Sequence, residues 1–549
     1  MKKFWQQQRW PIIGVVLFQL ITTIPYFSRQ PFNWDAAQFE LGVRHFSLHM
    51  HQPHPPGYPL YIALGKLVAL AVSPRAALVM ITIMIASCAV LGMYYVVWRW
   101  YGQRWLAVIV TLLFATNPLF WLYRVVPLTY VVDAAVTIWL SIFTLASFHT
   151  LQQQQRDHYG YAAAILLGIA SGFRPSLVVL FLPVLAIHWW RMRRWQSISV
   201  SLVMMVALVL VWLIPLLLLS GGPAAYWIDS IEQYRSAAET TSIVAGASWS
   251  ANWETIVTLG QSLLAVGNVL WLVVGVMAVS KIYQLAHTKR WPDWRYVIFG
   301  VAWIMPSLLV YGLIHFGQIG YLLTIIPSLY LPVAAGLYWC SQHARRWWYG
   351  VGVMVGLAWL VQASIFLWLV PAYTHPAYLP QRRIDIALQK LARQLPMLFK
   401  LNASYIQQTD DRLTTLQEVV QSYDPATTVI LAGRNVTYPA AGNGLPVRND
   451  EVFRELSAIV PMSHLIEVSP NRQYYLEAQQ YQLTWHNTTT ITVPSSTRHV
   501  IIMLQTIPPQ QLPQGILLER RSANYGQTYY VGVMTGPFSL FNYTVTYEP

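Results

Sequence analysis

The sequence predicts a polytopic α-helical membrane protein with about eleven spans, followed by a C-terminal soluble domain of α/β or mostly β structure. Of its 549 residues, 55% are hydrophobic and only 10% are charged, whereas an average soluble domain has about 25% charged residues. About eleven apolar stretches approach or reach the roughly 20 residues that a spanning helix needs. The composition changes after residue 371, because 12 of the 21 acidic residues but only Trp485 of the 25 tryptophans follow it.

The first 371 residues are predicted to form the membrane domain. Its first apolar stretch follows "MKKFWQQQRW" and has no small-residue cleavage site after it, which indicates an uncleaved signal anchor. The stretches 160–173 and 175–190 are short and broken at "GFRPS", so they form either one re-entrant hairpin or two tilted half-spans. The full set of expected spans is 11–28, 76–98, 105–122, 128–149, 160–173, 175–190, 197–219, 256–280, 295–314, 319–339 and 348–370.

The distribution of positive charge orients these spans. With the N-terminus inside, the inside loops hold fifteen Lys and Arg residues and the outside segments hold seven, as the positive-inside rule requires. This orientation makes residues 29–75 a long outer loop. Within it, 58–72 is short and interrupted by Lys66, so we expect a helix lying in the membrane interface rather than a span. Apolar residues at helical spacing predict a second interfacial helix within 35–49.

The charge distribution argues against nucleic-acid binding, and the two cysteines argue against a disulfide in the C-terminal domain and a cysteine metal cluster. The net charge is +14, of which residues 1–371 carry +13 (22 − 9) and residues 372–549 carry +1 (13 − 12). The excess therefore lies where Lys and Arg set membrane topology, and no basic soluble surface is left to bind nucleic acid. Cys88 and Cys340 lie in or beside apolar spans, so they form neither a disulfide in the C-terminal domain nor a cysteine metal cluster.

The remaining residues, 372–549, are predicted to form a soluble domain on the outer face of the membrane. Residues 381–421 show helical alternation, and short β-like runs such as "HLIEV" and "RHVIIML" follow, separated by Gly, Pro and Asn. This domain is expected to bind the acceptor or a partner protein.

Asp35 is the strongest catalytic candidate, because it follows the first span directly, in "PFNWDAAQFELG". A carboxylate at the outer water interface can accept a proton from an attacking hydroxyl. The four residues "DAAQ" also match a capping box, with Asp35 as N-cap and Gln38 as its return partner. Both interpretations stay open, since a carboxylate that caps with one oxygen has the other available.

Residues 51–57, "HQPHPPG", form a stiff corner with three prolines between the two interfacial helices. His51 and His54 are potential metal ligands, but no set of carboxylates accompanies them and no metal is indicated. A plain turn is the alternative interpretation.

An acidic residue just past the first span, followed by this His-Pro-Pro-Gly corner and an interfacial helix, resembles the GT-C superfamily of membrane glycosyltransferases. The sequence looks most like relatives of the protein O-mannosyltransferases and the lipid A aminoarabinose transferases. Segments 117–134, 168–184 and 315–337 are similar to later loops of that superfamily, and the resemblance covers residues 5–371. Many relatives carry an adjacent acidic pair in the first loop, whereas here the next acid after Asp35 is Glu40.

The resemblance implies transfer of a sugar from a polyprenyl-phosphate-linked donor to an acceptor hydroxyl on the outer face, with inversion and with Asp35 as general base. We expect a multi-pass protein of the bacterial cytoplasmic membrane, with its N-terminus inside, by the distribution of Lys and Arg, and its C-terminal domain outside. No cofactor is required, because guanidinium groups can take the role of a metal ion; a metal ion is the alternative, but none is indicated. The acceptor is a protein, a glycan or a lipid. One alternative is a ligase or polymerase of lipid-linked glycans. Another is a transporter or flippase of a lipid-linked intermediate, although transporters often carry paired broken helices and only one broken pair is present here.

A lipid-phosphate donor needs cations at the outer interface. Arg124 and Arg174 fall at predicted outer ends of spans, where a guanidinium can contact phosphate bidentately, and His54 is a further candidate. Asp133 lies inside a predicted span, where an acid is a functional candidate or else pairs with one of these arginines.

Four more residues are expected to contact substrate. His315, Gln318 and Tyr321 fall at another outer mouth, where the alternative is an interfacial aromatic belt. Glu40 is expected to contact substrate or to pair with Arg44 at i, i+4.

Overall fold

The chain folds into two compact units in this computed structural model. The helical unit comprises Met1–Phe27, Tyr58–Leu64 and Leu78–Tyr405, and the sheet unit comprises Ser28–Gly57, Gly65–Ala77 and Ile406–Pro549. The predicted boundary between residues 371 and 372 lies outside the described residues. The structure describes residues 2–239, 241–271, 274–275, 293–316, 318–343, 348–369, 386–388, 390–391, 395, 398–433, 452–469, 473–503, 513–523 and 528–548.

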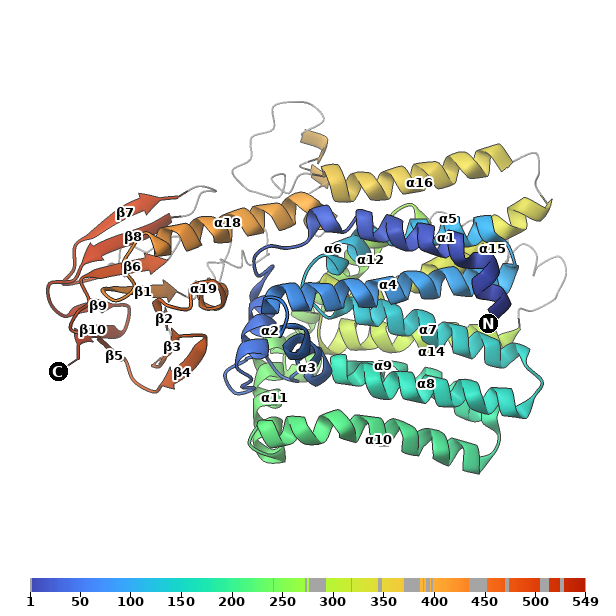
Figure 1. Cartoon of the computed structure of the whole chain (residues 1–549), viewed down its shortest axis with the longest axis horizontal. Helices are drawn as coiled ribbons and strands as arrows, with labels where there is room; N and C mark the ends of the chain where they lie inside the picture. The colour runs from blue at the N-terminus through green and yellow to red at the C-terminus, as the bar shows by residue number, and fades with distance from the viewer. Residues whose placement is uncertain are drawn as a thin grey trace. The chain divides into compact units, whose positions relative to one another are not determined.

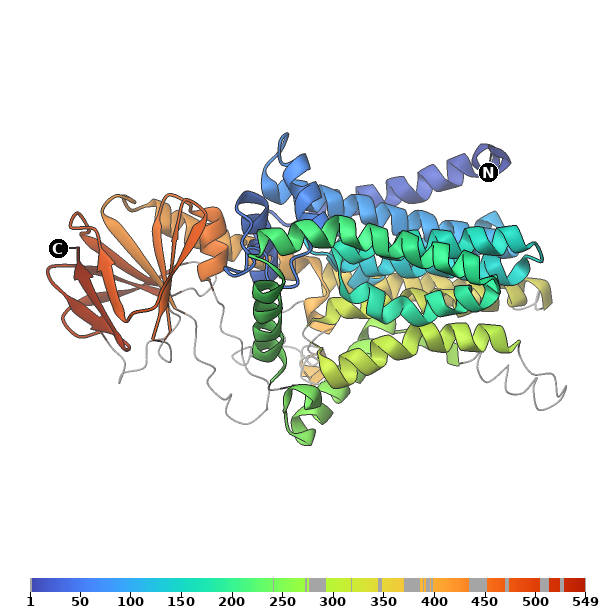
Figure 2. The ribbon, with the colours of Figure 1, turned by 90° about the horizontal axis from the view of Figure 1, so that it is seen from below.

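The helical unit consists of long helices that run roughly parallel to one another (Figures 1 and 2). In chain order, it contains α1 (Lys2–Ile21), η1 (Ile24–Tyr26), α4 (Pro74–Tyr101), α5 (Arg104–Ala115), α6 (Pro118–Arg124), α7 (Tyr130–His149), α8 (Gln153–Phe173), α9 (Ser176–Met192), α10 (Trp195–Leu219), α11 (Pro223–Ala238), η2 (Ile243–Ala245), α12 (Trp249–Gly267), α14 (Trp294–Leu309), the π-helical turn η3 (Val310–Ile314), η4 (Ile319–Thr324), α15 (Pro327–His343) and α16 (Trp348–Trp368).

Five helices of the described residues are long and apolar enough to cross a membrane, or six if one bent pair is a single span. The protein is therefore a multi-pass helical membrane protein by helix length and composition, but the predicted number of about eleven spans is not confirmed. The five lie within Gln7–Tyr26, Pro74–Tyr101, Tyr130–His149, Trp195–Leu219 and Trp294–Ile314. Part of the stretch predicted at 256–280 lies outside the described residues.

The stretch predicted as a span at 105–122 is not one continuous helix. This stretch forms α5 and α6, which meet at an angle of 69°. Asn117 causes the break, because its side chain accepts hydrogen bonds from the backbone N–H groups of Leu119 and Phe120, and Pro118 occupies the first helical position.

The stretches 160–173 and 175–190 form two complete helices, α8 with 21 residues and α9 with 17. The chain breaks between them because Pro175 disfavours helical geometry at Arg174, which has extended backbone angles. α8 also packs closely on α10: a Cβ atom at Gly168 would lie 2.8 Å from Cβ of Leu208.

The helix α11, which crosses the direction of the others (Figure 2), was not predicted.

The two helices predicted for the first outer loop are both present, as α2 (Trp34–Arg44) and α3 (Pro59–Val68).

The sheet unit contains a seven-stranded sheet with the order β4-β3-β2-β1-β6-β8-β7 and a three-stranded sheet with the order β5-β10-β9 (Figure 1). β1 pairs in parallel with β2 and β6, and the outer strands are antiparallel. The short helix η7 (Leu398–Lys400) still belongs to the helical unit. The elements of the sheet unit after it are α18 (Ala403–Gln421), β1 (Thr428–Gly433), α19 (Phe453–Ile459), β2 (His464–Val468), β3 (Tyr475–Gln479), β4 (Gln482–His486), β5 (Thr490–Val493), β6 (His499–Met503), β7 (Leu518–Ser522), β8 (Thr528–Val533), β9 (Phe538–Leu540) and β10 (Tyr543–Tyr547).

The central strand β1 is buried on both faces, which explains its unbroken apolar sequence. Ile430 packs in the core beneath α18 and α19, and its neighbour Leu431 packs in the core shared with the three-stranded sheet. Successive strand residues point to opposite faces of the sheet, so alternate residues of this one apolar run pack into the two cores. The predicted β-rich C-terminal region is confirmed.

Glu477 on β3 bridges two histidines of neighbouring strands. Its Oε1 lies 2.6 Å from Nε2 of His464, and its Oε2 lies 2.7 Å from Nε2 of His486. The hydrogen bond to His464 is the largest cause that lowers the pKa of the Glu477 carboxyl, and burial partly opposes it. A carboxyl with a lowered folded-state pKa stabilises the fold above its unfolded-state value and loses that contribution as the pH falls through the folded-state pKa.

We therefore expect Glu477→Gln to lower the free energy of unfolding of the sheet unit at pH 7 by about 1–2 kcal/mol. Thermal unfolding of the purified chain from pH 7 down to pH 3 measures this difference. The gap between wild type and variant should narrow at acidic pH. Glu548→Gln, at an exposed position, is the control, and a gap independent of pH contradicts the prediction.

Candidate catalytic loop and buried cation cluster

Asp35 is not the N-cap of α2. Asn33 is the cap, because its side chain accepts a hydrogen bond of 3.0 Å from the backbone N–H of Ala36. The predicted capping box is therefore wrong, and Asp35 is the second residue of the helix. Its side chain remains 26% exposed, and the capping hydrogen bond is made by Asn33 instead.

The proline-rich corner packs directly against α2 and brings His54 close to Asp35. A Cβ atom at Gly42 would lie 2.7 Å from the backbone nitrogen of Pro53, so only glycine permits this approach. Nδ1 of His54 lies 2.7 Å from Oε1 of the buried Gln38 and 3.9 Å from Oδ1 of Asp35. Within the described part of the chain, no group of three or more His, Cys, Asp or Glu side chains has an arrangement that could hold a metal ion.

Glu40 anchors the same loop through two arginines. One carboxylate oxygen lies 3.1 Å from Nη2 of Arg44 and the other accepts a 2.8 Å hydrogen bond from Nε of Arg75. The predicted i, i+4 pair with Arg44 is confirmed. A substrate contact by Glu40 stays a prediction, and both of its oxygens already have cationic partners.

In the helical unit, several predicted residues form one group around the buried side chain of Arg174. Nη1 of Arg174 lies 3.1 Å from Oδ2 of Asp133, so the pairing of this intramembrane acid with an arginine is observed. The guanidinium carbon also lies 4.6 Å from the ring centre of Tyr130 and 5.2 Å from that of Tyr321. The ring of His315 is 6.0 Å from that of Tyr321.

This group, which we call the Arg174 cluster, also contains Tyr130 and Tyr311. The Tyr311 ring stacks on Tyr321 at 5.0 Å, and Tyr311 lies in η3, a π-helical turn of the kind often found at functional sites. Neither tyrosine was predicted from the sequence. Tyr130 had a readable signal, because it precedes Asp133 by three residues and therefore shares its helix face.

Gly320 allows η4 to approach α7 in this cluster. A Cβ atom at this position would lie 2.5 Å from the Tyr130 ring and 2.8 Å from the Tyr123 ring. Gln318 directly precedes η4, and its carbonyl accepts a hydrogen bond from the backbone N–H of Tyr321.

Arg124 has a different environment. Its guanidinium is fully buried, donates to the carbonyl of Ala115 at 2.6 Å and to Oγ1 of Thr22 at 2.7 Å, and lies over the Trp121 ring. None of these partners belongs to the Arg174 cluster. The contacts favour a structural role that ties the ends of α1 and α5 together, and a phosphate contact by Arg124 stays a prediction.

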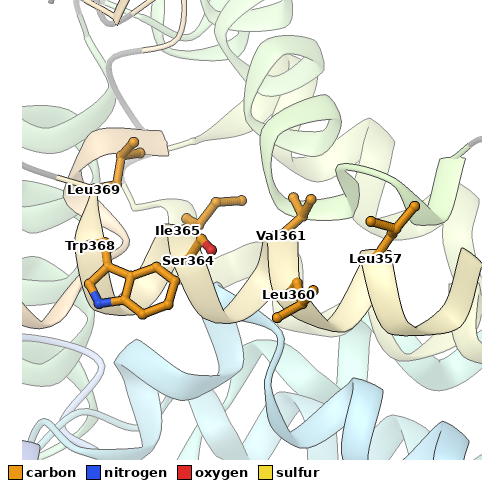
Figure 3. A pocket seen from close by; sticks show the side chains of 7 residues that line it. All are labelled: Leu357, Leu360, Val361, Ser364, Ile365, Trp368 and Leu369. Atoms are coloured by element: carbon orange, nitrogen blue, oxygen red, sulfur yellow. The ribbon is translucent and has the colours of Figure 1, made fainter. Parts of the chain in front are cut away.

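The helix α16 carries an apolar pocket of about 320 Å³. Figure 3 shows its lining side chains along this one helix and its end, and none of them is charged. The pocket therefore supplies no phosphate-binding group, although lipid chains fit such a surface. The lining residues are Leu357, Leu360, Val361, Ser364, Ile365, Trp368 and Leu369.

Comparison with known proteins gives a match to a family model and a likeness to solved structures. Residues 44–199 match the model of the protein O-mannosyl-transferase TMEM260 N-terminal domain. The structure of ArnT from Cupriavidus metallidurans bound to undecaprenyl phosphate is similar with a TM-score of 0.51 and 13% identity, covering 89% of this chain and 99% of that one. ArnT from the same organism in the apo state gives a TM-score of 0.50 and 12% identity, covering 88% and 98%.

No curated protein sequence matches this chain. The predicted resemblance to the GT-C superfamily of membrane glycosyltransferases is thus confirmed, by the family model over residues 44–199 and by a fold shared over most of the chain.

Proposed function

We propose that this protein is a glycosyltransferase of the bacterial cytoplasmic membrane that moves a sugar from a polyprenyl-phosphate-linked donor to an acceptor hydroxyl on the outer face. The observation that carries the proposal is the partly exposed carboxylate of Asp35 beside His54. This carboxylate is not used to cap α2, because Asn33 is the cap. The undecaprenyl phosphate bound by the structural neighbour supports the class of donor.

In this reaction Asp35 accepts the proton of the acceptor hydroxyl as the hydroxyl oxygen attacks the anomeric carbon. The new carbon–oxygen bond forms on the face opposite the phosphate, so the configuration inverts. The bond between the anomeric carbon and the phosphate oxygen breaks, and polyprenyl phosphate leaves with the bonding electrons. The Arg174 guanidinium stabilises the negative charge on the departing phosphate.

The Arg174 cluster has the chemistry that such a donor requires. The Asp133 carboxylate is fully buried, and beyond its ion pair with Arg174 it receives no hydrogen bond from the described residues. A buried carboxylate needs further donors, and the hydroxyl groups of a sugar can supply them. Tyr321 and His315 border the same cluster, and we assign them, with Gln318, to contacts with the donor sugar.

A donor-release assay tests this proposal. The purified chain, reconstituted in nanodiscs, is given a panel of polyprenyl-phosphate sugars with peptide, glycan and lipid acceptors, and mass spectrometry measures free polyprenyl phosphate and glycosylated acceptor. We expect both products in equal amounts with one donor. Transfer of a whole lipid-linked glycan instead identifies a ligase. Movement of the donor between leaflets, with neither product formed, identifies a flippase and contradicts the proposal.

A further inference from the structure

The loop that carries Asp35 folds as part of the sheet unit, although the two regions are far apart in the chain. Residues Ser28–Gly57 group with Ile406–Pro549 in one compact unit. Ala37 and Leu41 of α2 belong to the same buried apolar core as Leu413 of α18 and Leu456 of α19. An isolated helix of 11 residues is marginally stable in water, so these contacts decide how α2 is held.

Asp410 of α18 holds the chain segment immediately before α2. Its Oδ2 accepts a hydrogen bond from the backbone N–H of Arg29 at 2.8 Å, and its Oδ1 accepts from the backbone N–H of Gln30 at 2.9 Å and from Oγ of Ser28 at 3.2 Å. Asp410 is only 8% exposed. Three consecutive residues are therefore fixed by one carboxylate, and such charge-assisted hydrogen bonds are stronger than neutral ones.

The same face of α18 makes a second contact with this segment. Nε2 of Gln30 donates to Oγ1 of Thr414 at 3.2 Å and to Oε1 of Gln417 at 3.0 Å. Positions 410, 414 and 417 recur at helical spacing, so they form one row on the helix.

Arg454 of α19 holds the other end of the loop. It is 3% exposed, and its Nη1 donates a 2.7 Å hydrogen bond to the carbonyl of Met50. Its guanidinium carbon lies 5.4 Å from the ring centre of Trp34, the residue immediately before Asp35. One buried cation thus contacts both the start of α2 and the chain that leads into the proline-rich corner.

A third group of contacts joins the loop to the turn between β3 and β4. Nε2 of Gln52 donates to the carbonyl of Tyr481 at 3.0 Å, and the guanidinium carbon of Arg44 lies 3.9 Å from the centre of the Tyr481 ring.

We infer that Asp410 and Arg454 are positioning residues, through which the C-terminal region holds the general base Asp35 in its catalytic orientation. This inference rests on the proposed function, in which Asp35 is the base. Neither residue touches the reacting atoms; each acts through the backbone or the aromatic ring that flanks Asp35. A misplacement of about 1 Å at a reacting group can reduce the rate about 10²-fold, so the loss of either contact should lower turnover.

The test uses the full chain in nanodiscs with Asp410→Ala and Arg454→Met. Two readouts are followed, the hydrogen exchange of loop amides in residues 28–50 and the kinetics of donor release. We expect the exchange rate of the Arg29 and Gln30 amides to rise at least about 10-fold in Asp410→Ala, because the carboxylate that accepts their hydrogen bonds is lost. We also expect kcat per folded protein to fall about 10- to 100-fold in both variants, with the donor KM changed by less than about threefold.

Conservative and control variants separate positioning from simple destabilisation. Asp410→Glu and Arg454→Lys retain the charges and should recover part of kcat. Glu418→Gln on α18 and Arg520→Met on β7 lie at exposed positions of the same unit and should change neither readout. Amides of the core strands β1 and β6 should exchange as in the wild type.

Three results overturn the inference. They are unchanged loop exchange, faster loop exchange with unchanged kcat, and loss of protection in β1 and β6 with activity lost only in proportion to the unfolded fraction. Failure of the proposed function has a different signature, since the wild-type chain then releases no polyprenyl phosphate, whereas the exchange readout reports on the contacts of Asp410 and Arg454 independently of activity.

Discussion

Asp35→Asn should lower the turnover of donor release by about 10²- to 10⁴-fold, the range that general base catalysis contributes. The substituted amide cannot accept the proton of the acceptor hydroxyl. The fold should persist for two reasons. Asn33 rather than Asp35 caps α2, and the asparagine that replaces Asp35 has a side chain of the same size. Polyprenyl phosphate release by the reconstituted variant measures the effect, and donor KM should stay close to the wild-type value.

A matched variant separates the base from the helix that carries it. Asn33→Ala removes the cap and should lower the stability of α2 by about 1 kcal/mol, yet it leaves the Asp35 carboxylate in place. We expect the folded fraction of this variant to retain most of its turnover. If Asp35→Asn transfers sugar at the wild-type rate, the base is another residue.

Arg174→Met should cause the largest combined loss of stability and activity. The substitution leaves the fully buried Asp133 carboxylate without its cation, and breaking such a pair typically costs about 3–5 kcal/mol. It also removes the guanidinium proposed to hold the donor phosphate. Thermal unfolding in nanodiscs and the donor-release assay measure the two effects separately.

The double variant Asp133→Asn with Arg174→Met distinguishes the structural role of the pair from its function. Removing both charges eliminates the uncompensated carboxylate, so we expect most of the stability to return. Transfer should stay absent, because no cation is left for the phosphate. Recovery of transfer together with stability would contradict the assignment of Arg174 to the donor.

Arg174→Lys gives a finer test of the same assignment. Lysine retains the charge but loses the planar guanidinium that lies near the Tyr130 and Tyr321 rings and that can contact phosphate through two donors. We expect intermediate stability and a raised donor KM.

Local sequence signals were read correctly where one physical force dominates. Apolar stretches such as 197–219 predicted α10 within two residues, because the hydrophobic content of a membrane helix leaves no competing interpretation. The two helices of the first loop were predicted from other signals, the helical spacing of apolar residues within 35–49 and the short apolar stretch 58–72 interrupted by Lys66. Capping was read incorrectly, since both Asn33 and Asp35 are good cap formers and the sequence does not state which of them begins the helix.

The break at Asn117 was missed for a related reason. The apolar run from 105 to 122 is nearly continuous, and hydropathy hides a bend that one Asn-Pro step produces. That the Asp35 carboxylate is partly exposed and makes no cap bond follows from Asn33 being the N-cap of α2, which only the backbone of that turn shows.

The sequence alone determined that this chain is a multi-pass helical protein with a β-rich C-terminal region, and it identified Asp35, Asp133 and Arg174 as groups of unusual position. Only the tertiary structure decided that Arg174 pairs with Asp133 among three tyrosines, and that Asp410 and Arg454 hold the loop of Asp35. Partition between lipid and water depends on local composition and is therefore readable along the chain. A contact between residues 382 positions apart leaves no local signature, because it depends on how two separately encoded elements pack.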